Sequence, residues 1–116
     1  MGRLALTMYE WFQIGTVMTT GRNRFEVVIT GYTYAIRDES EQEIIAWHWH
    51  PERAHTAPHP HLHIGAGALV RREELYRAHL PTGIVTVADV VHSANTDFHV
   101  EPRRDDWQTI LSAADF

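Results

Sequence analysis

The sequence predicts a small α+β domain, in which an antiparallel sheet of three or more strands precedes C-terminal helices packed on one of its faces. Apolar and polar residues alternate in segments between residues 25 and 64, which is the period of a strand. Between residues 86 and 114, apolar residues recur every three or four positions, as on one face of a helix. Because 116 residues suit one modest core, we expect residues 1–116 to form a single domain.

The N-terminal segment is predicted to form a short helix. Leu4, Met8, Trp11 and Phe12 are spaced as on one face of an amphipathic helix over residues 4–14, with a strand as the alternative. Residues 19–24 are polar and contain a glycine, which predicts a turn before the sheet begins.

Residues 25–36 predict the first strand of the sheet. They hold two apolar sets of opposite parity, which meet near Gly31, and this pattern indicates a β-bulge there. The first set comprises Phe25, Val27 and Ile29, and the second comprises Val28, Tyr32, Tyr34 and Ile36.

Two further strands are predicted at residues 43–50, rich in Ile and Trp, and at residues 59–64. Residues 37–42 form a charged connection between the first two strands, and residues 51–58 are long enough to return the chain antiparallel. The three strands together predict an antiparallel meander.

The segment after the sheet is predicted to be loosely structured at first. Residues 65–67 contain two glycines and are expected to loosen the chain. Residues 72–80 are expected to form a helical turn or two, which residues 81–83 end.

Two C-terminal helices follow in the prediction. Thr86, with Asp89 three residues later, forms a weak capping box at the start of the first helix. The apolar face of that helix comprises Val87, Val90, Val91, Ala94 and Phe98. Residues 101–104 break the chain, and Asp105 or Asp106 is expected to cap the last helix. Its inner face comprises Trp107, Ile110, Leu111 and Ala114.

Histidines are concentrated in residues 47–65, which hold six of the nine in the chain. Five of them lie at two-residue spacing within the predicted strands, so that each run points to one face of the sheet. The tryptophans between them are expected to face the core. If the strands pair with His48 opposite His61, all five imidazoles share one face, whereas a slip of one residue would separate the two runs. The five are His48, His50, His59, His61 and His63.

Composition limits the classes of function. The formal net charge is −5 and the isoelectric point about 5.9, which argues against a general nucleic-acid coat protein. No apolar run reaches the roughly 20 residues that cross a bilayer, and the N-terminus lacks the order of a secretory signal. We therefore expect a cytoplasmic protein without a membrane partner, and exposed sheet edges that favour a homodimer.

Three interpretations of the histidine-rich face stay open. The first is structural: a solvated, half-buried face without chemistry, in which protonated imidazoles would repel one another. The second is a site for a divalent transition metal, zinc-like, because imidazole binds such ions and three histidines with an open position form catalytic sites. Glu52 is near enough in the sequence to act as a further ligand or as a base. The candidate ligands are His48, His50, His59, His61 and His63.

The third interpretation is phosphoryl chemistry by imidazoles near neutral pH. Residues 59–65, with the sequence HPHLHIG, resemble the signature strand of the histidine-triad nucleotide hydrolases. The resemblance covers seven residues, and it implies that His61 attacks a phosphate while its neighbours orient it and assist the leaving group.

A second resemblance extends over roughly residues 30–107. It is carried by HWHP at residues 48–51, PHLH at 60–63, HLPTG at 79–83 and DW at 106–107. These segments are similar to those of the TumE-like bacterial toxin group and of related small bacterial proteins. The resemblance implies growth inhibition through RNA or nucleotide chemistry, and a cognate antitoxin as protein partner.

These patterns give a set of candidate functional residues. The candidate catalytic residues are His48, His61 and His63, one acting as general base and another as general acid. The candidate substrate-binding residues are Arg71, Arg72 and His79, with an arginine holding a phosphate. His79 precedes the turn at residues 81–83, which could fold it back towards the sheet as a further member of the site. A non-catalytic interaction module with pH-sensitive histidines is a further alternative, so whether the protein is an enzyme stays open.

Overall fold

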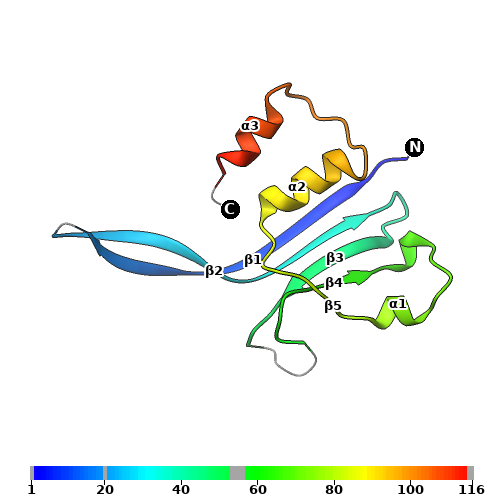
Figure 1. Cartoon of the computed structure of the whole chain (residues 1–116), viewed down its shortest axis with the longest axis horizontal. Helices are drawn as coiled ribbons and strands as arrows, with labels where there is room; N and C mark the ends of the chain where they lie inside the picture. Colours follow the sequence, from blue (N-terminus) through cyan, green and yellow to red (C-terminus); the bar gives the residue numbers. More distant parts are fainter. Residues whose placement is uncertain (1, 20, 53–56, 115–116) are drawn as a thin grey trace.

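A computed structural model describes residues 2–19, 21–52 and 57–114, and within these ranges the fold is a small α+β domain. Five antiparallel strands form one sheet in chain order (Figure 1). The strands are β1 (Ala5–Thr19), β2 (Arg22–Arg37), β3 (Glu43–Trp49), β4 (His61–Ile64) and β5 (Leu80–Pro81). The helical elements are the 3₁₀ turn η1 (Ala66–Ala68) and the helices α1 (Glu74–Arg77), α2 (Val87–Thr96) and α3 (Trp107–Ser112).

The predicted N-terminal helix over residues 4–14 is wrong, because this segment belongs to β1. β1 pairs with β2 along its whole length, from Ala5 opposite Arg37 to Thr19 opposite Arg22. Its many aromatic and β-branched residues suit a strand, and pairing with β2 prevails over the helical spacing of a few apolar positions. The turn after β1 is also shorter than predicted, with Gly21 at a φ of +75°; Thr20 lies outside the described residues.

The predicted bulge is confirmed, and it reorganises one face of the sheet. Trp11 pairs with Gly31 and Phe12 with Ile29, so Thr30 is an extra residue in β2. An extra residue reverses the side-chain parity of the strand beyond it. Phe25, Val27 and Ile29 before the bulge therefore share one face with Tyr32, Tyr34 and Ile36 after it. Val28, the remaining member of the second predicted set, precedes the bulge and lies on the opposite face.

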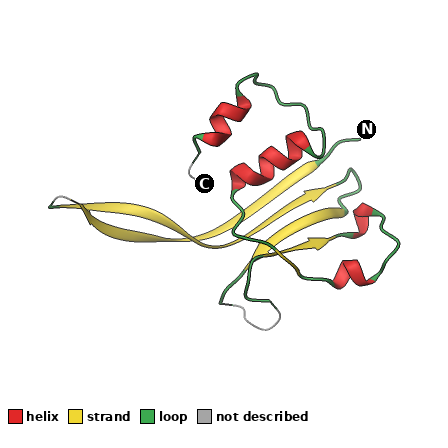
Figure 2. Cartoon of the chain, viewed as in Figure 1, coloured by secondary structure: helices red, strands yellow, loops and turns green. Residues whose placement is uncertain are grey.

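The core lies between this face of the sheet and α2 (Figure 2). Its buried members come from β2, β3 and α2, and they are Tyr32, Tyr34, Ile36, Trp47 and Val90. The backbone N–H of Val85 donates to the hydroxyl of Tyr32 at 2.9 Å, which holds the start of α2 against the sheet. The predicted capping box is confirmed, because Thr86 and Asp89 each accept a hydrogen bond from the other's backbone N–H.

The last helix, α3, packs on α2 rather than directly on the sheet. The Trp107 ring lies 5.6 Å from the His92 ring of α2, and no α3 side chain belongs to the core cluster of the described residues. Asp106 occupies the N-cap position as predicted, but it makes no side-chain cap hydrogen bond. Its carboxylate instead accepts two hydrogen bonds from Arg104, at 3.0 and 3.1 Å.

The glycine-containing segment after β4 is more closely packed than the sequence suggests. The backbone N–H of Gly65 donates to the carbonyl of Ile44 at 2.9 Å, and η1 follows at once. The segment therefore extends the pairing of β3 with β4 instead of loosening the chain. None of the helices in the described ranges is both long enough and apolar enough to cross a membrane.

Candidate metal centre

The central histidines are positioned by the pairing of β3 with β4. His48 lies opposite His61, and Ala46 opposite His63, so the expected register of the first pair is confirmed. Because side chains alternate along each strand, the residues between them, Trp47 and Leu62, face the core. The fold thus places the apolar residues on one face of the sheet and the histidines on the other.

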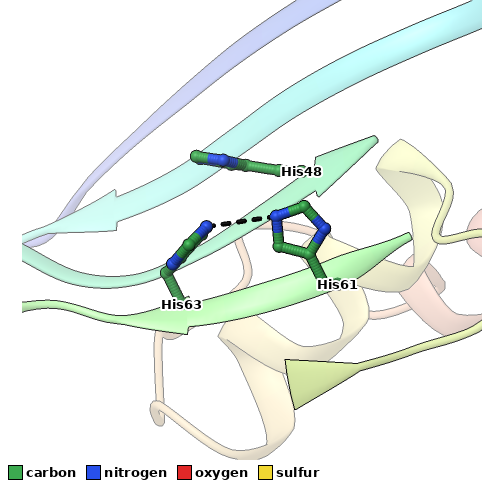
Figure 3. A group of neighbouring side chains, drawn as sticks. All are labelled: His48, His61 and His63. Atoms are coloured by element: carbon green, nitrogen blue, oxygen red, sulfur yellow. Dashed lines mark hydrogen bonds between the residues drawn. The ribbon is translucent and has the colours of Figure 1, made fainter. Parts of the chain in front are cut away.

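Three imidazoles form the centre of this face: His48, His61 and His63. We call these three residues the histidine triad, a name that refers to them alone and not to the histidine-triad hydrolases. One ligand nitrogen from each lies within 4.8 Å of the others, so the three are close enough to hold one metal ion. Figure 3 shows His61 and His63, from the same strand, below His48 of the neighbouring strand.

One hydrogen bond identifies the tautomer of the neutral His61 ring. Its Nδ1 lies 2.8 Å from the carbonyl oxygen of His59, and because a carbonyl only accepts, this nitrogen carries the proton. In the neutral ring, Nε2 therefore has a free lone pair. That atom lies 3.1 Å from Nε2 of His63 (Figure 3), and in the metal-free protein His63 must donate this hydrogen bond.

Three further histidines surround the triad. The His79 ring lies 4.9 Å from that of His61 and 4.7 Å from that of His63. The His50 ring lies 5.7 Å from His48, and the His59 ring 5.7 Å from His61. The structure therefore brings together all five strand histidines of the sequence prediction, and it places His79 beside them, as a further member of the site.

Burial favours the neutral form of His48 and His63 in this cluster. His61 is only 4% exposed, and the triad lies where protonated imidazoles are poorly solvated. Desolvation, and then repulsion by the neighbouring imidazoles, lowers the pKa of His48 from 6.5 to about 4. The same causes lower the pKa of His63. Both rings are therefore neutral at pH 7, the state in which imidazole binds a metal.

We expect the metal-free protein to lose stability as the pH falls from 6.5 towards 4. In this window the unfolded chain binds a proton at His48 that the folded chain does not, so the free energy of unfolding decreases as the pH falls. Partial exposure reduces the effect to about 2 kcal/mol. Urea unfolding with a chelator at pH 7.5 and 4.5 measures it, and His48→Gln should show a smaller loss. An equal loss in both proteins would contradict the burial of a neutral His48.

The remaining predicted site residues lie outside the triad. Arg71 and Arg72 are exposed on the segment between η1 and α1, and among the described residues no ion pair or side-chain hydrogen bond joins them to the histidines. Glu52 is exposed and lines a shallow pocket with His50 and Trp11. It does not belong to the group of ligand atoms that could share a metal among the described residues.

Two contacts of His50 were not predicted from the sequence. Its Nε2 lies 3.0 Å from the hydroxyl of Thr33 in β2, and the Trp11 ring of β1 lies 5.1 Å from its ring, edge to face. Thr33 pairs with His48 in the sheet, so the alternation of β2 could have identified it once the register was known. Trp11 could not be identified, because its segment was predicted to be helical.

The comparisons with known proteins add no relative from which a function could be transferred. Searches against protein-family models, curated proteins and solved structures found no match, so the role of the histidine triad must be inferred from its own geometry.

Proposed function

We propose that this protein binds one divalent transition metal ion, zinc-like, through His48, His61 and His63. The observation that carries the proposal is the convergence of three imidazole nitrogens within 4.8 Å on one face of two paired strands. The sheet fixes the backbone of all three ligands, so little conformational entropy is lost when they converge on an ion.

The distances within the triad suit such an ion. In a tetrahedral site with Zn–N bonds of about 2.0–2.1 Å, two ligand nitrogens are about 3.3 Å apart. The two Nε2 atoms of His61 and His63 are 3.1 Å apart, which is close to this value. A cation would take the place of the proton between these nitrogens, with His63 carrying its proton on Nδ1 instead, and His48 would supply the third nitrogen, which lies within 4.8 Å of the other two.

The hydrogen bond behind His61 supports the same role. A metal-binding histidine commonly donates its other ring N–H to a carbonyl or carboxylate, which fixes the ring and its tautomer. His61 does so through Nδ1 to the carbonyl of His59 at 2.8 Å. The ring is therefore held with its lone pair directed at the position of the proposed ion.

Three protein ligands leave one coordination position open. Sites of this type bind water or substrate there, and the metal lowers the pKa of the water so that a nucleophile forms at neutral pH. His79 is exposed and next to the triad, so we assign it to the open side, where it can hydrogen-bond to what binds. A metal-dependent hydrolytic enzyme is the class of function that this arrangement supports best.

The resemblance to TumE-like toxins supplies an expectation for the substrate, which is RNA or a nucleotide, and for the partner, which is an antitoxin. Phosphodiester cleavage is within the chemistry of a metal-bound water. We expect expression of the wild-type chain to inhibit bacterial growth, and expression of the His61→Ala/His63→Ala double variant not to. Equal inhibition by both chains, at equal protein levels, would remove the toxin interpretation.

Metal content tests the proposed site directly. Untagged protein, analysed by elemental mass spectrometry after exchange into zinc-containing and then zinc-free buffer, should retain about one zinc per chain. His63→Ala should retain almost none. The flanking variants His50→Ala and His59→Ala should retain zinc, because these residues lie outside the triad. Zinc-free wild-type protein, or retention in His63→Ala, would show that the triad does not bind metal.

A further inference from the structure

The outer half of the β1–β2 hairpin projects away from the rest of the fold. β3 pairs with β2 only between Tyr32 and Arg37, so residues 12–19 and 22–29 form a two-stranded ribbon, which we call the arm. Figures 1 and 2 show that no helix covers the arm in the described part of the chain. An isolated two-stranded ribbon is only marginally stable in water. The side chains on the two faces of the arm therefore indicate what kind of surface stabilises it.

The two faces of the arm differ sharply. Ile14 pairs with Val27, and Thr16 with Phe25, which places one apolar set from both strands on the same side. Five large apolar side chains on this side of the arm are between 58% and 78% exposed. We call this surface the arm face, and these residues are Phe12, Ile14, Met18, Phe25 and Val27.

The opposite face of the arm is suited to water. It carries Gln13, Arg24 and Glu26, with the smaller apolar residues Val17 and Val28 between them. The arm is therefore amphipathic, as is a strand pair with one face on a core. The bulge at Thr30 is what creates this asymmetry, because it aligns the apolar residues of β2 with those of β1 on the side that continues the core face of the sheet.

The apolar area that the arm face exposes is large for the surface of a soluble monomer. The arm face exposes on the order of 650 Å² of side chain, which matches the largest apolar patches of typical soluble monomers, and patches of this size are often interaction sites. None of the five residues is charged, and the chain has no lysine, the residue that most often protects exposed strands from association. Such a face is stabilised when a second apolar surface covers it.

We propose that the arm face is a homodimer interface, in which the arms of two copies of this chain pack face to face about a two-fold axis. Both strands contribute apolar residues opposite one another, so a two-fold copy presents a matching row, as an isologous contact requires. Two arm faces together expose about 1,300 Å², and covering most of this area gives an interface near the lower limit of stable protein interfaces. The product is a small four-stranded sandwich, and each ribbon gains the second layer that it lacks.

This interface is independent of the proposed metal site, and it differs from edge-to-edge pairing of strands. The contact surface is the side-chain face of the arm, and the histidine triad lies on the opposite face of the main sheet. A dimer joined through the arms leaves both triads accessible. Because the arm face is uncharged, while each chain has a net charge of −5, added salt should preserve or strengthen the dimer rather than weaken it.

Sedimentation velocity with a matched pair of variants tests the proposal. We expect a wild-type dimer at concentrations from about 1 to 100 μM. Val27→Glu places a charge in the centre of the arm face and should raise the dissociation constant of the dimer at least about 100-fold. Val17→Glu makes the same change on the opposite face, beside Arg24, and should leave the dimer intact. The double variant Ile14→Thr/Val27→Thr, which keeps β-forming residues, should also be monomeric.

A wild-type monomer over the whole concentration range would overturn the proposal, and so would dissociation by Val17→Glu as complete as that by Val27→Glu. A wild-type monomer that binds a different protein through the arm face would overturn it as well. Circular dichroism and zinc content, measured on each variant, separate loss of the dimer from loss of the fold. Zinc retained by monomeric Val27→Glu would show that the two proposals stand or fall separately.

Discussion

His61→Ala is expected to abolish tight zinc binding, with a dissociation constant raised at least about 100-fold, because loss of an outer-shell partner alone costs about 10–100-fold. His61 is the most buried member of the triad, at 4% exposure, and its ring is held on both sides by hydrogen bonds. At zinc concentrations about 100 times the wild-type dissociation constant, the wild-type free energy of unfolding should rise by about 2.7 kcal/mol. Because the same zinc concentration is then no more than the dissociation constant of the variant, its increment should be at most about 0.4 kcal/mol. Urea unfolding with and without zinc measures it.

The control for this experiment is a histidine outside the cluster. His99 is exposed and has a φ of +58°, a conformation that asparagine tolerates better than most residues other than glycine. His99→Asn should therefore keep both the fold and the zinc-induced stabilisation. Because His61→Ala also leaves a buried gap, His61→Gln is a second variant that retains more of the side-chain volume. A zinc increment retained in both His61 variants would rule out the triad.

The register of the histidine-rich strands could be predicted from the sequence because two constraints agree. Residues 47–50 and 61–64 each alternate histidine with a large apolar residue, and burying one apolar set leaves a single parity for the histidines. The intervening loop then limits the offset between the strands. The observed pairing of His48 with His61 satisfies both constraints. The centre of the site could therefore be predicted from the sequence.

Other parts of the fold depend on contacts that the local sequence does not encode. Residues 4–14 carry both a helical spacing and many strand-forming residues, and only pairing with β2 decides between the two. His79 reaches the triad because Leu80 and Pro81 form the two-residue strand β5 beside His61 and Leu62. A strand this short has no periodicity, so β5 itself was not predicted, and only the turn at residues 81–83 indicated that His79 could fold back towards the sheet.

Gly65→Ala is expected to destabilise the protein by on the order of 3 kcal/mol, the scale of a substitution that forces the backbone apart in a packed region. A Cβ added at Gly65 would overlap the backbone carbonyl of Glu43 in β3, a group that cannot move as a flexible side chain can. The φ of Gly65 is −93°, so the cost comes from the close approach of the backbone and not from its conformation.

The same substitution is expected to weaken zinc binding, because it acts where β4 leaves β3. Gly65 follows Ile64 at the end of β4, and its N–H donates to the carbonyl of Ile44. Separating the strands there moves His63 away from His48, two triad members on different strands. Gly83→Ala is the matched control, since a Cβ at Gly83 meets nothing within 4 Å, and it should change the free energy of unfolding by no more than about 0.5–1 kcal/mol. If Gly65→Ala were as stable as Gly83→Ala, β4 could be held to β3 without this close contact. If it were unstable but bound zinc normally, the ligands would not depend on the spacing of the two strands, and the sheet would not be what fixes the triad.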